Sequence, residues 1–354
     1  MSGVSQPTIR IGHRKIGAGF PAYFIAEISA NHHHRYQEAA TLIRAAKSAG
    51  ADAVKFQTYT ADTITLDCDK KDFRIRGGTL WDGRTLYDLY KSAYTPWEWQ
   101  PKLKKLADRL GIEFFSSAFD PTAVDFLETL GVPVHKVASF EIVDIPLIEK
   151  MARTGKPMIL STGLSNEREI NEAVTAARKH GATQLALLKC SSAYPAPPES
   201  MNLKAISYLA ARFRLPIGLS DHTTGTEIAV AAVSLGACLV EKHLTLSRRA
   251  GGPDSAFSLE PAEFKRMIDS VRVVEKALGG DRLGSSRAET KSRMFRRSLY
   301  AVRDIAAGDC LTPDNVRSIR PAFGLAPKHA GKVWGRRAAK RVSRGTPLGW
   351  DLIR

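Results

Sequence analysis

Cysteine is scarce in this sequence and long apolar runs are missing, and both absences exclude whole classes of protein. The four cysteines, Cys68, Cys190, Cys238 and Cys310, lie far apart and form no Cys-x-x-Cys pair. This spacing argues against a zinc knuckle and a disulfide framework, and it fits a reducing compartment. No run approaches the roughly 18 apolar residues of a membrane helix, and the N-terminus lacks the apolar segment of a secretion signal. We therefore expect a cytoplasmic protein without membrane contact.

No Gly-x-Gly-x-x-Gly motif follows the first apolar run, so a dinucleotide-binding fold has little support. The sequence instead alternates short β-branched runs with helical patterns such as the apolar series Ala39, Leu42, Ile43 and Ala46. Strands alternating with helices predict a parallel sheet, and eight repeats favour a closed (β/α)₈ TIM barrel over an open doubly wound sheet. The expected strands are residues 23–28, 53–57, 113–117, 134–138, 158–162, 185–189, 216–220 and 238–242.

The remaining sequence predicts a second, smaller domain. We place the barrel at 1–280, a linker rich in glycine, serine and charge at 281–294, and a small β-rich domain at 295–354. The net charge of the chain is +16, and residues 287–354 alone carry +11 of it. A basic tail of this kind suits nucleic acid or lipid, or it attracts a small polyanionic substrate. The long connection 58–95 is typical of a functional lid.

Two histidines follow the last two expected strands at matched positions. His222 follows the seventh strand, His243 follows the eighth, and Glu241 lies two residues before His243. The carboxyl ends of barrel strands meet where barrel enzymes place their sites, so we expect the two imidazoles to be close. Two imidazoles with open positions suit Mn²⁺, Zn²⁺ or Fe²⁺ as a Lewis acid, although either histidine alone would equally suit a capping hydrogen bond. Of the three histidines at 32–34, only His32 is a candidate to reach this site.

Hydroxyl groups and lysines end the other strands. One point charge with several hydroxyl donors is what a phosphate group needs, and the candidates are Lys136, Ser117, Ser139, Ser161 and Ser220. The alternative is that the serines merely terminate strands. Lys55 is a candidate Schiff-base lysine, but we favour a charge partner for Glu27 or for a substrate carboxylate.

These residues stand in segments that resemble the N-acetylneuraminate synthase family, whose members make nine-carbon 2-keto sugar acids. The segments are FIAEISANHHH, ADAVKFQTY, HKVASFEI, ILSTG, KCSSAYPAP, GLSDHT, EKHLTL and GGPDSAFSLEP. After the linker, RRSLYAVRDIAAGDCLTPDNVRSIRP looks like the antifreeze-like (SAF) domain that follows the barrel in this family. The resemblance implies a transferase that condenses phosphoenolpyruvate with a free amino-sugar aldehyde and releases phosphate.

One branch of the family fits better still. The loop segment GGTLWDGRTLYDLYKSAYTPWEWQ looks like that of the pseudaminic acid synthases. This likeness implies that the sugar substrate is 2,4-diacetamido-2,4,6-trideoxy-L-altrose and that the loop recognises it. The alternatives are an N-acetylneuraminate or legionaminate synthase with the same chemistry, and loop aromatics that only pack a lid onto the barrel.

The resemblance also implies roles for single residues. It assigns His222 and His243 to a divalent metal ion, foremost Mn²⁺ with Mg²⁺ or Co²⁺ as alternatives. It places Glu27, Lys55 and Gln57 in the sugar pocket; from their chemistry we expect catalytic roles for these three and for Glu241, which would orient His243. The substrate-binding positions it implies are Ser117, Lys136, Ser139, Ser161, Tyr194, Ser220, Asp254 and Arg320. We add Thr162 and Ser192 from the same strand ends, although relatives of the sialic branch have Asn at the position of Ser192.

Arg320 matches an arginine that the tail domain inserts into a partner subunit, which implies a domain-swapped homodimer. Two other classes remain as alternatives. An aldolase or 3-deoxy-sugar-acid phosphate synthase would want a second cationic phosphate site, and beyond Lys136 the barrel shows no obvious one. A nucleic-acid-binding protein would want aromatic residues among the basic runs of the tail, where they do not cluster, so we expect no nucleic-acid partner.

Overall fold

The computed structural model describes residues 7–280, 283–284 and 286–354. The chain forms two compact units, Met1–Gly279 and Gly280–Arg354, and each is described by itself. Among the described residues, no helix combines the length and the apolarity needed to cross a membrane.

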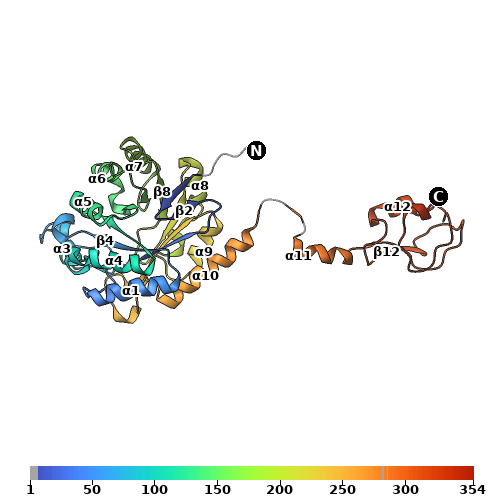
Figure 1. Ribbon diagram of the computed structural model, residues 1–354, viewed down its shortest axis with the longest axis horizontal. Coiled ribbons are helices and arrows are strands. Elements are labelled where there is room, and N and C mark those ends of the chain that lie inside the picture. The colour runs from blue at the N-terminus through green and yellow to red at the C-terminus, as the bar shows by residue number, and fades with distance from the viewer. Residues whose placement is uncertain (1–6, 281–282, 285) are drawn as a thin grey trace. The chain divides into compact units, whose positions relative to one another are not determined.

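The first unit is a closed barrel of eight parallel strands wrapped by helices (Figure 1). Each strand pairs with the next along the chain, and the last one, β10, pairs with β3 to close the ring. This confirms the predicted (β/α)₈ barrel. The observed strands are β3 (Tyr23–Glu27), β4 (Ala53–Thr58), β5 (Glu113–Ala118), β6 (His135–Val137), β7 (Met158–Ser161), β8 (Leu185–Cys190), β9 (Ile217–Asp221) and β10 (Leu239–His243).

The helices between these strands bury an apolar stripe against the barrel. In α7, for example, the buried side chains recur every three or four residues, and the helix begins with a capping box between Asn166 and Glu169. Gly50 ends the first helix at φ 94°, a left-handed conformation in which glycine carries no steric cost. The main helices are α1 (Tyr36–Ala49), α4 (Gln100–Leu110), α5 (Pro121–Leu130), α6 (Ile145–Ala152), α7 (Glu167–Lys179), α8 (Ala205–Phe213), α9 (Glu227–Ser234) and α10 (Pro261–Leu278).

An N-terminal hairpin that the sequence analysis did not predict precedes the barrel. Strands β1 (Thr8–Ile11) and β2 (Arg14–Gly17) pair antiparallel, and Ile9, Ile11 and Ile16 are buried in the barrel core. The Arg10 amide donates to Gln184, just before β8, over 2.7 Å, and Arg14 pairs with Asp52, just before β4. The hairpin therefore covers the end of the barrel where the strands begin.

The long connection after β4 folds into short elements. These are α2 (Ala61–Ile64), a 3₁₀ turn at Lys71–Phe73, α3 (Leu86–Ala93) and a second turn at Trp97–Trp99. The Trp97 indole donates to the Tyr59 carbonyl over 3.1 Å and stacks on Phe126, with the ring centroids 4.8 Å apart. Part of the aromatic content of this loop thus fixes the loop to the barrel.

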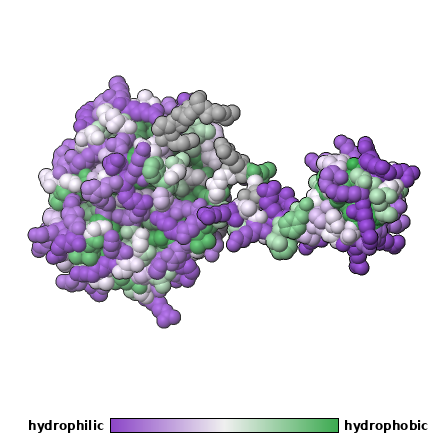
Figure 2. Space-filling model, turned by 45° about the vertical axis from the view of Figure 1, so that its right-hand side comes forward, coloured by the Kyte–Doolittle hydropathy of each residue, from purple (hydrophilic) through white to green (hydrophobic). Residues whose placement is uncertain are grey.

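The second unit has its own small core. It contains a two-stranded antiparallel sheet of β11 (Ser298–Ala301) and β12 (Val316–Ile319). The short helix α11 (Arg287–Thr290) precedes this sheet in the chain, and α12 (Ala330–Val333) follows it. Leu299, Val316, Val333 and Leu348 are among its buried residues. In Figure 2 the visible face of this unit is largely hydrophilic, in keeping with its basic sequence. Of the expected linker, residues 281, 282 and 285 lie outside the described residues.

Candidate active site

Strand register brings the predicted catalytic residues to the carboxyl end of the barrel. Glu27 is paired with His243 on one side and with Lys55 on the other. Further round the ring, Ser117 is paired with both Gln57 and Lys136, and Ser220 with Glu241. Side chains at alternate positions of a strand share a face. Residues 55 and 57 of β4 therefore point the same way, as do residues 241 and 243 of β10.

Two lysines and two carboxylates form the centre of the site. Lys55 Nζ lies 2.7 Å from Glu27 Oε2, 3.0 Å from Ser117 Oγ and 3.7 Å from Glu241 Oε2. Lys136 Nζ lies 3.8 Å from Glu241 Oε1. Each of these charged side chains is at most 6% exposed. Lys55 therefore forms an ion pair with Glu27, the role that the sequence analysis favoured over that of a Schiff-base lysine.

Burial separates the proton affinities of these groups. Loss of water raises the pKa of Glu27 to about 7, with help from the negative Glu241 and against the pull of Lys55. Burial acts on Glu241 in the same direction, but Lys136 and Lys55 outweigh it and hold the pKa of Glu241 below its ordinary value. Burial lowers the pKa of Lys136. Of the two carboxyl groups, Glu241 therefore favours the ionised form, whereas the pKa of Glu27 is near neutrality.

The hydroxyl groups of the expected phosphate site divide into two sets. Lys136 Nζ donates to Ser161 Oγ over 2.8 Å, and Ser139 and Ser192 meet at Gly163, where an added Cβ would lie 2.6 Å from Ser139 Oγ. In contrast, the Ser220 hydroxyl donates to Glu241 over 3.1 Å, and the Thr162 hydroxyl donates to the Leu188 carbonyl over 3.1 Å. The cationic, hydroxyl-lined corner is therefore made by β6, β7 and the start of the loop after β8.

The two predicted metal ligands face each other across the ends of β9 and β10. The ring centroids of His222 and His243 lie 5.4 Å apart, and both residues are 6% exposed. His222 Nδ1 donates to the Ser191 carbonyl over 2.8 Å, which leaves Nε2 as the atom with a free lone pair. Burial lowers the pKa of His243 well below its ordinary value, so this ring is neutral. For His222, burial is outweighed by Cys190 and the Ser191 carbonyl, which raise its pKa, so a metal ion would displace a proton from this ring.

These two histidines suit a divalent cation, because each ring keeps a nitrogen available. His243 Nδ1 is buried and has no hydrogen-bond partner among the described residues. Within the same part of the chain, no group of three or more His, Cys, Asp or Glu residues gathers into a ready-made metal cluster. An ion held here would therefore rest on two imidazoles and keep positions for water or substrate. Glu241 faces the lysines and Ser220, so its carboxylate is not in a position to orient His243.

His32 is engaged elsewhere. Its Nε2 contacts Thr95 Oγ1 at 3.1 Å, and its Nδ1 accepts from the His34 amide at 3.1 Å. With both ring nitrogens occupied, His32 supports the loop against Trp99 and is not available to a metal ion.

A series of hydrogen bonds links Glu27 to Asp254 through Gln57 and Ser29, and Ser29 was not among the residues that the sequence analysis named. Gln57 Nε2 donates to Glu27 Oε1 and to Ser29 Oγ, each over 3.0 Å, and the Ser29 hydroxyl donates in turn to Asp254. Both amide hydrogens of Gln57 are thereby used, so its carbonyl oxygen is the group left for a substrate. Ser29 adopts φ 46°, which is uncommon for a residue other than glycine.

Glu141 is a second residue that sequence reasoning missed. It lies in the 3₁₀ turn Ser139–Val143 that follows β6, and its Oε2 is buried without a hydrogen-bond partner in the described part of the chain. Burial raises the pKa of Glu141 to about 7 against the pull of Lys136. Its position two residues after Ser139 is the only signal in the sequence that points to the site.

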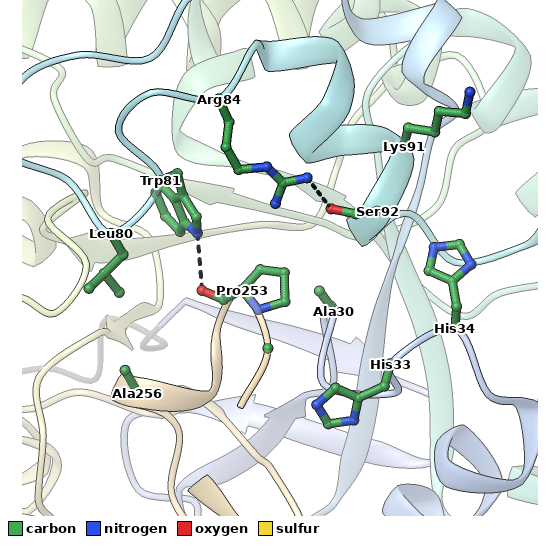
Figure 3. A pocket seen from close by; sticks show the side chains of 11 residues that line it. Ala30, His33, His34, Leu80, Trp81, Arg84, Lys91, Ser92, Pro253 and Ala256 are labelled. Carbon is green, nitrogen blue, oxygen red and sulfur yellow. Dashed lines mark hydrogen bonds between the residues drawn. The ribbon is translucent and has the colours of Figure 1, made fainter. Parts of the chain in front are cut away.

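A cavity of about 780 Å³ lies between the long loop, His33 and His34, and the segment around Pro253 (Figure 3). The Trp81 indole donates to the Pro253 carbonyl over 3.1 Å and so ties the loop to the barrel. The Trp81 ring lies 5.7 Å from Tyr194, which in turn lies 4.3 Å from the His222 ring. Ring contacts thus run from the cavity wall at Trp81 through Tyr194 to His222, which does not itself line the cavity. Its remaining lining residues include Ala30, Leu80, Arg84, Lys91 and Ala256.

Residues 42–282 match the NeuB family, and residues 296–354 match the SAF domain. The chain belongs to the NeuB family. It is 44% identical to the pseudaminic acid synthase of Campylobacter jejuni over 92% of this chain and 95% of that protein. It is 36% identical to the N,N'-diacetyllegionaminic acid synthase of Legionella pneumophila over 97% of each. The crystal structure of a sialic acid synthetase from Leptospira borgpetersenii aligns with a TM-score of 0.73 at 32% identity, covering 81% of this chain and 95% of that one.

Proposed function

We propose that this NeuB-family chain is a sugar-acid synthase that condenses phosphoenolpyruvate with an amino-sugar aldehyde, with pseudaminic acid as its product. The observation that carries the proposal is the placement of the imidazole pair beside a buried cluster of two lysines and two carboxylates. One substrate brings a phosphate and a carboxylate, for which Lys55 and Lys136 are the nearby cations. The other brings a carbonyl group, for which two imidazoles can hold a metal ion.

In this proposal, the hydroxyl-lined corner receives the phosphate of phosphoenolpyruvate. Lys136, Ser161, Ser139 and Ser192 supply charge and donors there, while Lys55 and Ser117 face the carboxylate. C3 of the enol attacks the aldehyde carbon, and the positive charge that develops at C2 lies near Glu27. Water then adds at C2, and phosphate leaves by cleavage of its C–O bond. Holding both reactants in place supplies several kcal/mol of the lowering of the barrier.

A divalent ion bound by His222 and His243 would supply Lewis-acid polarisation of the aldehyde oxygen. The protein's own carboxyl groups handle the protons. Glu27 is ionised above a pKa of about 7 and stabilises the positive charge or accepts a proton from the attacking water. Glu141 holds a proton up to a similar pH and is suited to donate it to an oxygen that becomes negative.

The cavity beside Trp81 supports the choice of sugar. A 2,4-diacetamido-2,4,6-trideoxyhexose exposes three methyl groups and two amides, and the cavity offers both apolar residues (Ala30, Leu80, Pro253, Ala256) and polar ones (His33, His34, Arg84, Lys91, Ser92). The higher identity to a pseudaminic acid synthase, 44% against 36% to a legionaminic acid synthase, points the same way. Legionaminate or N-acetylneuraminate synthesis by the same chemistry is the second candidate, because synthases for both products are also similar to this chain.

We include the tail domain in the proposal. Arg320 is exposed on a unit that also carries most of the net charge. We propose that it completes the site of a partner subunit in a domain-swapped homodimer and that the basic surface attracts the dianionic substrate.

The direct test is to incubate the purified protein with phosphoenolpyruvate and each amino sugar in turn, with Mn²⁺ or with EDTA, and to measure released phosphate. We expect release with the 2,4-diacetamido-2,4,6-trideoxy-L-altrose sugar and Mn²⁺, and none with EDTA. Faster release with N-acetylmannosamine or the legionaminic precursor would replace the proposed product. Release that EDTA leaves unchanged would remove the metal ion from the proposal.

A further inference from the structure

The ends of the two histidine-bearing strands are joined behind the active site by a buried ion pair. Lys242 Nζ lies 2.8 Å from Asp221 Oδ2, and both side chains are 0% exposed. The two residues are register partners on β10 and β9. Asp221 directly precedes His222 and Lys242 directly precedes His243. Because side chains alternate along a strand, the ion pair lies on the helix side of the barrel wall and the imidazoles lie on the inner side.

The same pair also fixes the residue that follows His222. Lys242 Nζ donates to the Thr223 carbonyl over 2.5 Å. Asp221 Oδ1 accepts from the Thr223 amide at 2.9 Å and from its hydroxyl at 2.8 Å. The residues on both sides of His222 are therefore held by one set of contacts, to which Lys242 of β10, the strand that carries His243, contributes two.

Stability alone does not account for this arrangement. A buried ion pair loses the hydration of both charges, and replacing such pairs with apolar side chains of similar size is often neutral or even stabilising. A contact that fixes the geometry of neighbouring ligands has a different consequence, because outer contacts that orient metal-binding histidines set the affinity for the metal.

We propose that the Asp221–Lys242 ion pair is a positioning device that holds His222 and His243 at the separation a divalent cation requires. Its effect on catalysis passes entirely through the two imidazoles, since neither charged group reaches the interior of the barrel. The inference rests on the proposed metal-binding role of the histidines.

The test compares metal affinity with stability in a double variant. Asp221→Asn combined with Lys242→Met removes both charges at nearly constant volume, which avoids leaving one charge buried alone. We expect the dissociation constant for Mn²⁺, measured by titration calorimetry on the metal-free protein, to rise about 10- to 100-fold. The Tm of the metal-free protein should stay within a few degrees of the wild type. At saturating Mn²⁺, kcat should return to near the wild-type value.

A control away from the site is the partly exposed pair Glu128–Lys156, which joins α5 to the start of β7 at the other end of the barrel with a 2.8 Å contact, and in which Glu128 also contacts His135. Glu128→Gln with Lys156→Met should leave Mn²⁺ affinity unchanged. An unchanged affinity in the Asp221/Lys242 variant, or an equal loss in the control, would overturn the positioning role. If the wild type itself binds no Mn²⁺ while His222→Ala keeps full activity, the metal site is wrong, which is a different failure.

Discussion

Glu27 combines a buried carboxylate, a lysine partner and a pKa near neutrality in one residue. In the proposed reaction it acts only when positive charge develops at C2. Glu27→Gln keeps the shape and the hydrogen bond to Gln57 but removes the charge. We expect the dissociation constant for phosphoenolpyruvate to change little and kcat to fall by about 100-fold or more. Equilibrium binding and steady-state rates check this, and a wild-type kcat would remove Glu27 from the mechanism.

The pKa of Glu27 also predicts a pH profile. Because burial raises this pKa to about 7, the carboxylate is mostly ionised at pH 8 and mostly protonated at pH 6. If the ionised form is the active one, kcat falls as the pH drops through about 7, with a limiting slope of about tenfold per pH unit. The small residual kcat of Glu27→Gln should lack this acid limb. An acid limb at pH 4 to 5 in the wild type would show that Glu27 titrates as an ordinary carboxyl group.

Gly163 is the position where a single methyl group would reach the expected phosphate site. An added Cβ would lie 2.6 Å from Ser139 Oγ and would also collide with Ser192 Oγ. We expect Gly163→Ala to raise the KM for phosphoenolpyruvate by about tenfold through displaced hydroxyls, with a smaller effect on the sugar. Gly331→Ala is the control, because nothing lies within 4 Å of its added Cβ. Equal KM values for phosphoenolpyruvate in the two variants would show that the phosphate does not bind beside Gly163.

At this scale the sequence predicted the candidates on strand ends, and it predicted only some of those on turns: Ser139 was named, but Ser29 and Glu141 were missed. Glu27, Lys55 and Glu241 lie on strands, where alternation fixes the face of each side chain. Ser29 and Glu141 lie in a left-handed turn and a 3₁₀ turn, whose geometry no periodic pattern encodes. Thr162 and Ser220 were predicted as substrate donors, but their hydroxyl protons go to Leu188 and Glu241, a choice that only the packed structure fixes.

At the scale of elements, the eight barrel strands were predictable because each is a buried apolar run between helices with clear apolar stripes. Their observed ends differ from the predicted ones by at most one residue, as with β9, which runs to Asp221. The N-terminal hairpin was missed because its two strands are only 4 residues each. The alternation of buried Ile9 and Ile11 with polar neighbours around Gly12 was the available signal.

The loop that carries Trp81 gives a prediction about sugar recognition. Trp81→Phe removes the indole donor to Pro253 and loosens the wall of the cavity next to Tyr194. We expect the KM for the amino sugar to rise about tenfold while the KM for phosphoenolpyruvate stays constant. Trp97→Phe is the matched control, since Trp97 also donates to a carbonyl, that of Tyr59, but does not line the cavity. A rise in both KM values, or none, would place the sugar outside this cavity.

For the whole molecule, the proposed domain swap predicts that two inactive variants restore each other. A dimer of one Glu27→Gln subunit and one Arg320→Ala subunit contains one intact site if Arg320 acts on the partner's barrel. Mixing the unfolded variants and refolding them together should recover about a quarter of the wild-type activity. If Arg320 acted within its own subunit, no site would be restored. Sedimentation of the wild type as an active monomer would also refute the swap.

The β1–β2 hairpin has a kinetic consequence. With the strand-start end covered and the barrel interior filled by side chains, reactants enter and products leave through the same mouth. The phosphate corner lies among the strand ends, whereas the cavity beside Trp81 lies outward in the loops. A sugar bound first would block the way in. For the proposed reaction we therefore expect the enol phosphate to bind before the aldose, and an unreactive sugar analogue to inhibit uncompetitively with respect to the enol phosphate.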